Sequence, residues 1–174
     1  MPKQKYQRGF SLIEVLVAVI VVSIGLVGLA GMQLVGLKGN QQSFSKNQAA
    51  HHTQALLERM RGNPSAVIDG DYTVDSTTLS CTAGFSTNCT AATSNCSSTQ
   101  IAQHDIYQAY CGNQTVSAGG IKSVLSNARL RISCPVNCTT GVTIDLTWEE
   151  QLLGRESTGS AVPRQLTINT RISK

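Results

Sequence analysis

The hydropathy pattern is dominated by an apolar run near the N-terminus that carries no charged residue from Val15 to Met32. At a rise of 1.5 Å per residue, a helix of this length spans about 27 Å, close to the hydrocarbon thickness of a bilayer. The basic residues Lys3, Lys5 and Arg8 precede the run and would keep the N-terminus cytoplasmic. The pattern predicts a single membrane-spanning helix with an exported C-terminal part.

Helical periodicity continues beyond the apolar run on a loosely drifting face. Its members are Leu34, Leu37, Gln41, Phe44, Gln48, Ala55, Leu56 and Met60. Gly62-Asn63-Pro64 supplies the stop signal. A helix from Phe10 to Arg61 would be about 78 Å long, so its outer half should serve the exported domain.

Glycines at positions 25, 28, 31, 36 and 39 interrupt this helix. Each costs about 1 kcal/mol relative to Ala in a helix interior. They can permit close helix approach in a membrane, mark a stretch that bends or unwinds on extraction, or simply be tolerated in a lipid-solvated anchor. The sequence leaves these alternatives open.

Three late segments, 128–133, 142–149 and 166–172, alternate apolar and polar residues. Such alternation predicts an antiparallel sheet with one apolar face, which we expect to lie on the outer half of the helix. Residues 76–100 and 154–163 have loop compositions. The expected core residues are Leu125, Leu130, Ile132, Ile144, Leu146, Trp148 and Ile168.

Glu14 is the anomaly of the N-terminal helix, because a carboxylate in an apolar membrane segment costs about 2.5–3.5 kcal/mol at the helix centre and less near the interface. Neither a plain anchor nor a secretory signal peptide benefits from it. The spacing of Gly28 and Ala30 fits ordinary signal cleavage, which stays a minor alternative. Gly9 followed by Phe10-Ser11-Leu12-Ile13-Glu14, after a short basic leader, resembles the processing site of type IV prepilins and pseudopilins.

This resemblance implies cleavage between Gly9 and Phe10 by a prepilin peptidase, which also N-methylates Phe10. It implies that the helix stays on the mature protein as membrane anchor and filament core. It further implies that Glu14 pairs with the N-terminal amine of a neighbouring subunit. An amine of pKa near 7.7–8.0 is mostly cationic at neutral pH, so such a pair is chemically reasonable.

The implied fold class is α+β: a type IV pilin-like long helix packed on a C-terminal antiparallel sheet domain with disulfide-bonded loops. We expect a leader at 1–9, the helix at 10–61 with its membrane and filament-core part at 10–35, and the globular domain at 62–174.

A second resemblance lies in residues 23–33 and in Leu57-Glu58-Arg59-Met60-Arg61-Gly62-Asn63, which are similar to PilV-type minor pilins, also called type IV pilus modification proteins. It covers about the first third of the chain. It implies a structural subunit that primes or modifies pilus assembly near the tip and supports twitching motility and adhesion. A minor pseudopilin of type II secretion and a ligand-binding tip adhesin are the alternatives.

The implied partners are the prepilin peptidase, other minor pilins, the major pilin, the inner-membrane assembly platform and, before assembly, membrane lipid. The implied location is the bacterial inner membrane, with the C-terminal domain in the periplasm, and then the assembled pilus.

All six cysteines lie beyond the apolar run, at positions 81, 89, 96, 111, 134 and 138. An even count on the outward side indicates disulfides in an oxidising compartment. Cys134 and Cys138 flank a short turn between strand-like segments and are the pair we expect. The pairing of Cys81, Cys89, Cys96 and Cys111 stays open, and zinc is the weaker interpretation of the C-x3-C spacing.

Charge and motifs argue against several other functions. The leader holds three of the 14 Lys and Arg residues, which leaves 11 against 10 acidic residues and no evident nucleic-acid surface. No nucleophile, metalloprotease or phosphate-loop motif is present, so we expect neither an enzyme, a cofactor nor a metal site. The three histidines, His51, His52 and His104, are expected at solvated surface positions.

Overall fold

The computed structural model describes residues 9–82, 89, 95–113, 119–150 and 161–172. By its internal contacts the chain divides into two compact units, Met1–Gln41 and Gln42–Lys174. Helix α1, Leu12–Gly62, contributes to both units and runs unbroken through the five glycines at positions 25 to 39. No atom lies within 4 Å of a Cβ built on any of these glycines, so within the chain they relieve no crowding.

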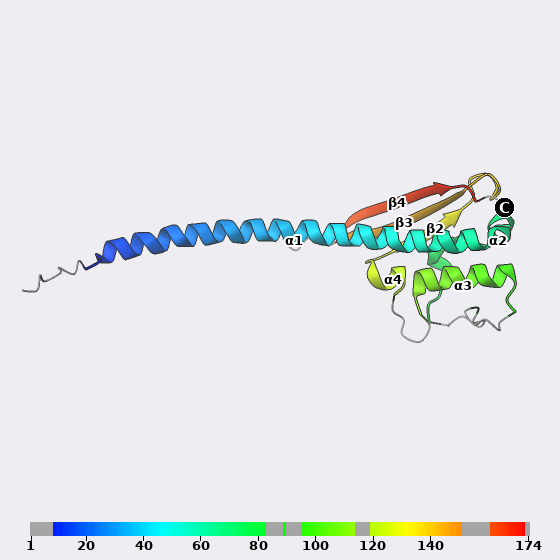
Figure 1. The fold of residues 1–174 in the computed structure, drawn as a ribbon, viewed down its shortest axis with the longest axis horizontal. Coiled ribbons are helices and arrows are strands. Elements are labelled where there is room, and N and C mark those ends of the chain that lie inside the picture. Colours follow the sequence, from blue (N-terminus) through cyan, green and yellow to red (C-terminus); the bar gives the residue numbers. More distant parts are fainter. Residues whose placement is uncertain (1–8, 83–88, 90–94, 114–118, 151–160, 173–174) are drawn as a thin grey trace, which may run out of the picture. The chain divides into compact units, whose positions relative to one another are not determined.

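The second unit contains one four-stranded antiparallel sheet (Figure 1). Its strands are β1 (Val74–Asp75), β2 (Arg129–Ser133), β3 (Val142–Glu150) and β4 (Val162–Thr170), in the order β1-β2-β3-β4. The predicted α+β fold, a long apolar helix with an antiparallel sheet, is confirmed. The sheet nevertheless gains the two-residue strand β1, which was not predicted.

Strand β4 begins earlier than the sequence pattern suggested. Val162 and Pro163, which we expected in a loop, are the first two residues of this strand. Pro163 is tolerated there because β4 is an edge strand and proline is confined to such edges. The rest of the expected loop, residues 154–160, lies outside the described part of the chain.

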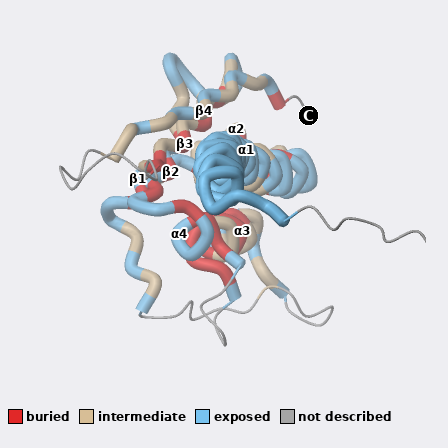
Figure 2. The backbone as a smooth tube through the Cα atoms, turned by 90° about the vertical axis from the view of Figure 1, so that its left-hand side faces the viewer, coloured by how far each residue is buried: buried red, intermediate tan, exposed pale blue. Residues whose placement is uncertain are grey.

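The sheet lies on one side of the second part of α1, and α3 and α4 lie on the other side (Figures 1 and 2). The apolar core is formed where these elements pack together. Facing strand positions such as Leu130–Leu146 and Ile144–Ile168 are register partners, as the two-residue alternation requires. Six of the seven predicted core residues are buried, and Ile168 is partly buried because it lies on the edge strand.

In the second unit, α1 buries Ala49, Thr53, Leu56, Leu57 and Met60. Thr53 can be fully buried because its hydroxyl donates to the carbonyl oxygen of Ala49 at 2.7 Å. Of the helix face expected from the sequence, Leu56 and Met60 are buried, whereas Phe44 and Ala55 are exposed.

Four short elements complete the second unit: α2 (Pro64–Asp69), the 3-10 helix Ser76–Thr78, α3 (Ser98–Cys111) and α4 (Ile121–Val124). Helix α3 was not predicted. Its start is a capping box, in which the Ser97 hydroxyl accepts from the Gln100 N–H and the Gln100 side chain accepts from the Ser97 N–H. Ala102, Ile106 and Tyr110 lie four residues apart on its buried face.

A polar network ties α3 to α1 and to the turn before β1. Arg59 donates to Asp105 at 3.1 Å, and the Tyr72 hydroxyl donates to the other Asp105 oxygen at 2.7 Å. Burial raises the pKa of Tyr72, and the hydrogen bond to Asp105 raises it further, so the phenol stays a donor. The buried carboxylate is thus paired and hydrogen-bonded, as a charge out of water must be.

The expectation that all three histidines are solvated is wrong for His104, which is 5% exposed. It lies on α3 next to Asp105, on the face that packs into the core. Burial lowers the pKa of His104; Asp105 opposes this shift and Arg59 adds to it.

Three disulfides lie in the second unit and leave no free cysteine. Cys134 is bonded to Cys138, the pair expected from the turn. Cys81 is bonded to Cys111 and joins the segment after the 3-10 helix to the end of α3. Cys89 is bonded to Cys96.

Removing the Cys81–Cys111 bridge should destabilise the protein more than removing the Cys134–Cys138 bridge. The first closes a separation of 30 residues and the second a separation of four. The loss of chain entropy in the unfolded state predicts a stabilisation of about 3.7 kcal/mol from the first bridge and about 2 kcal/mol from the second. Denaturant unfolding of the two double Cys→Ala variants tests this order, and a larger loss for the short loop would contradict it.

Stability should fall as the pH drops through about 6.5. The folded protein holds His104 neutral with a lowered pKa, so in acid the unfolded chain binds the extra proton and is favoured. His104→Gln should flatten the dependence of unfolding free energy on pH between about 7 and 5. Gln103→Ala, an exposed and non-titrating position on the same helix, is the matched control and should leave the slope unchanged.

Candidate functional site

The sequence-predicted site residues Gly9, Phe10 and Glu14 lie together at the start of α1. Gly9 and Phe10 precede the helix, and the Ser11 carbonyl accepts from the N–H groups of Glu14 at 3.0 Å and Val15 at 3.3 Å. Glu14 is therefore the third residue of the helix, in its first turn. Free N–H groups at a helix start favour a carboxylate at this position.

One face of the first four turns forms a shallow apolar groove. It is lined by Phe10, Glu14, Val15, Ala18, Val19, Val22 and Ser23. Phe10, Glu14, Ala18 and Val22 recur at four-residue intervals, which places them in one row. Of the seven residues, Ser23 and Glu14 are the polar ones, and only Glu14 is ionisable. The Ser23 hydroxyl is already used within the helix, because it donates to the Val19 carbonyl at 2.7 Å.

None of the ion pairs formed among the described residues involves Glu14. The side chains around it in the groove are apolar apart from Ser23. A carboxylate in such surroundings is stable only when a cation or hydrogen-bond donor comes from another molecule. The geometry thus presents an acidic group on an apolar face, with no ion-pair partner among the described residues.

Between Val15 and Met32, α1 has no charged residue and carries apolar side chains on every side. Within the described residues, α1 is the one helix with an 18-residue window long and apolar enough to cross a membrane, at mean hydropathy 2.8, and none of that window is buried. Phe10 is 83% exposed and Leu12 is 90% exposed. A helix that is hydrophobic all round requires lipid or other protein as its surroundings.

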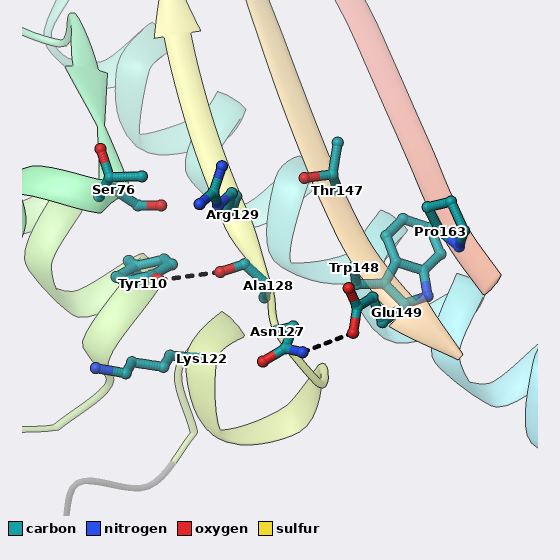
Figure 3. A pocket seen from close by; sticks show the side chains of 11 residues that line it. Ser76, Tyr110, Lys122, Asn127, Ala128, Arg129, Thr147, Trp148, Glu149 and Pro163 are labelled. Atoms are coloured by element: carbon teal, nitrogen blue, oxygen red, sulfur yellow. Dashed lines mark hydrogen bonds between the residues drawn. The ribbon is translucent and has the colours of Figure 1, made fainter. Parts of the chain in front are cut away.

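The second unit contains a cleft of about 650 Å³ that the sequence gave no reason to expect (Figure 3). It lies among α3, α4, the 3-10 helix and the ends of β2 and β3, and it has both polar and apolar walls. The Tyr110 hydroxyl donates to Ala128 at 3.0 Å, and the Asn127 amide donates to Glu149 at 2.6 Å. Lys122 and Arg129 add two cationic side chains.

The cleft walls hold no cysteine or histidine, and Glu149 is their single carboxylate. Its chemistry is therefore that of hydrogen bonding and charge pairing. In the described residues, no group of three or more His, Cys, Asp or Glu side chains is arranged to hold a metal ion.

Comparison with known protein families matches two consecutive parts of the chain. Residues 4–30 match the prokaryotic N-terminal methylation motif, and residues 31–107 match the family of the type IV pilin Tt1218. No curated protein and no solved structure matches the chain. The first match covers Gly9, Phe10 and Glu14, and the second covers the rest of α1 and most of α3.

Proposed function

We propose that this chain, which matches the family of the type IV pilin Tt1218 over residues 31–107 and the N-terminal methylation motif over residues 4–30, is a minor pilin of the PilV type. Its family and its apolar helix make it a membrane-anchored, pilus-associated structural protein. In the proposed role it primes or modifies pilus assembly near the tip, together with other minor pilins and the major pilin.

The observation that carries this proposal is the position of Glu14 in the first turn of an apolar helix, four residues after Phe10. Cleavage between Gly9 and Phe10 would create a new amine at Phe10. That amine and Glu14 would lie at the same end of every subunit. Subunits that stack along their helices can then pair the carboxylate of one with the amine of the next.

The energy of this pair explains why it would act in assembly and not in membrane insertion. Insertion is easier without a charge in the helix. Within an assembled core, breaking a buried pair by removing one partner costs about 3–5 kcal/mol, because the other charge is left alone. A subunit whose pair is broken should therefore be excluded from the filament by about 100-fold or more.

A ligand-binding role for the exported domain is a second candidate, favoured by the cleft that includes Lys122 and Arg129. The two cations are separate from the ion pairs found among the described residues. A tip subunit with such a cleft could bind an acidic surface group.

A pseudopilin of a secretion system is the remaining alternative, because it shares the N-terminal features. Neighbouring genes for secretion components would favour the pseudopilin.

Glu14→Gln should leave expression, membrane insertion and processing intact but lower incorporation into sheared pili by about 100-fold, the loss expected for a broken pair. Gln keeps the size and one hydrogen-bonding oxygen while removing the charge. Ser23→Ala is the matched control, because it removes a polar group of the same groove that is already bonded within the helix.

The assay uses a strain without the wild-type gene, and intact mass must show N-methyl-Phe10 as the first residue. Wild-type levels of the Gln variant in pili would contradict the pairing role. A mature N-terminus near Gly31 would contradict the prepilin interpretation itself.

A further inference from the structure

Strand β4 is an edge strand, and among the described residues no other strand pairs with its outer side. It pairs with β3 through nine register positions and is the last strand in the sheet order. Proteins usually protect such an edge by making it short, by charging it or by covering it. From Gln165 to Thr170, β4 contains neither a charged residue nor a proline.

The register shows which backbone groups point outward. Pro163 lies opposite Glu149, and the Glu149 N–H donates to Ser126 at 2.9 Å, away from β4. Pro163 has no N–H, so this pair is of the non-hydrogen-bonded kind. Because the pattern alternates, Gln165, Thr167 and Asn169 also direct their N–H and C=O groups away from β3.

A groove of about 500 Å³ lies beside this edge. Its walls are Ile168 of β4 and the α1 residues His51, Gln54, Ala55, Leu57, Glu58 and Arg61. Leu57 is buried and Ile168 is partly buried, so part of the floor is apolar. The α1 residues recur at three- and four-residue spacing, which makes them one stripe of the helix.

The groove and the open edge fit one kind of occupant. A strand added to β4 would run about 4.8 Å from it, with alternate side chains on the face that bears Leu166 and Ile168. That face is directed toward α1, so those side chains would enter the groove. We propose that β4 accepts an extended segment of another subunit as a fifth strand, by β-strand addition.

Charge defines the chemistry of this segment. Arg61 donates to Glu58 at 2.6 Å, so the two charges of the groove are already paired with each other. The β4 edge is uncharged from Gln165 onward. The matching segment is therefore uncharged over about six residues and alternates small apolar with polar side chains.

A second copy of this chain is a poorer occupant. Antiparallel pairing of two β4 strands would place a two-fold axis perpendicular to the sheet. That axis would reverse the direction of α1, which packs on the sheet. On the proposed function, on which this step rests, all subunits enter one membrane from the same side and keep their α1 helices parallel. Head-to-tail pairing of β4 with β1 of a second copy would keep the α1 helices parallel, but β1 is two residues long and is too short to cover β4. The partner is accordingly a different subunit of the assembly.

The test uses the full-length protein in cells and a photo-crosslinking residue, p-benzoylphenylalanine, in place of Gln165 on the β4 edge. The same residue in place of Thr143 is the positional control, because Thr143 lies on the same sheet face but on the inner strand β3. We expect a crosslinked product at Gln165 that peptide mapping assigns to an extended segment of another pilin-family subunit. The Thr143 position should give less than a tenth of it.

Two substitutions at Thr167 separate backbone pairing from side-chain contact. Thr167→Pro removes an outward N–H without removing a β3–β4 hydrogen bond, and it should reduce the product at least tenfold. Thr167→Val removes only the hydroxyl, which donates to Asp145 at 2.6 Å, and should leave the yield unchanged. If Thr167→Pro fails to form its disulfides, Asn169→Pro is used instead, because the Asn169 N–H also points away from β3.

Equal yields from the Pro and Val variants, a product with twice the mass of this chain, or equal crosslinking from Thr143 would each overturn the proposal. The intact mass of the protein from the same cells distinguishes failure of the proposed function from failure of the strand-addition proposal. Absence of N-methyl-Phe10 contradicts the proposed function, whereas processed protein that gives no product contradicts strand addition alone.

Discussion

The constraint on which the molecule depends is that a carboxylate must be kept in an apolar helix. Glu14 lies in the first turn of α1, where the helix end stabilises its charge but the neighbouring side chains are apolar. The isolated chain provides no cation for it within the described residues. Under the proposed function, a neighbouring subunit would supply the cation that this side chain lacks.

Helix α1 serves two surroundings with one continuous backbone. Up to Gln41 its side chains are exposed on nearly every side, which suits lipid or neighbouring helices. From Gln42 onward only one stripe is buried, against the sheet and α3. The Arg59–Asp105–Tyr72 network fixes α3 to this second segment, so the domain is held to the helix by charge as well as by apolar contact.

The sequence predicted those features that follow a simple period. The apolar run, the three main strands and most of the core could be read from spacing of 3.6 and 2 residues, and the pilin fold followed from the N-terminal motif. Helix α3 was missed because its buried face includes His104 and Asp105, which a hydropathy pattern assigns to the surface. Its capping box at Ser97 and Gln100 was the one local signal that could have revealed it.

Of the candidate sites, Glu14 was predictable because a charge in an apolar run is a local anomaly. The β4 edge and the cleft near Trp148 were not, because they exist only when segments far apart in the sequence lie side by side. The early start of β4 was hidden by Pro163, since a proline counts against a strand unless that strand is known to be at an edge.

The most direct test of the central claim is the position of the Glu14 carboxylate in an assembled filament, determined by electron cryomicroscopy of filaments that contain this subunit. The account predicts that a carboxylate oxygen lies within about 4 Å of the N-terminal nitrogen of a neighbouring subunit, the distance of an ion pair. A Glu14 side chain that faces only aliphatic side chains, with every neighbouring amine farther away, would contradict it.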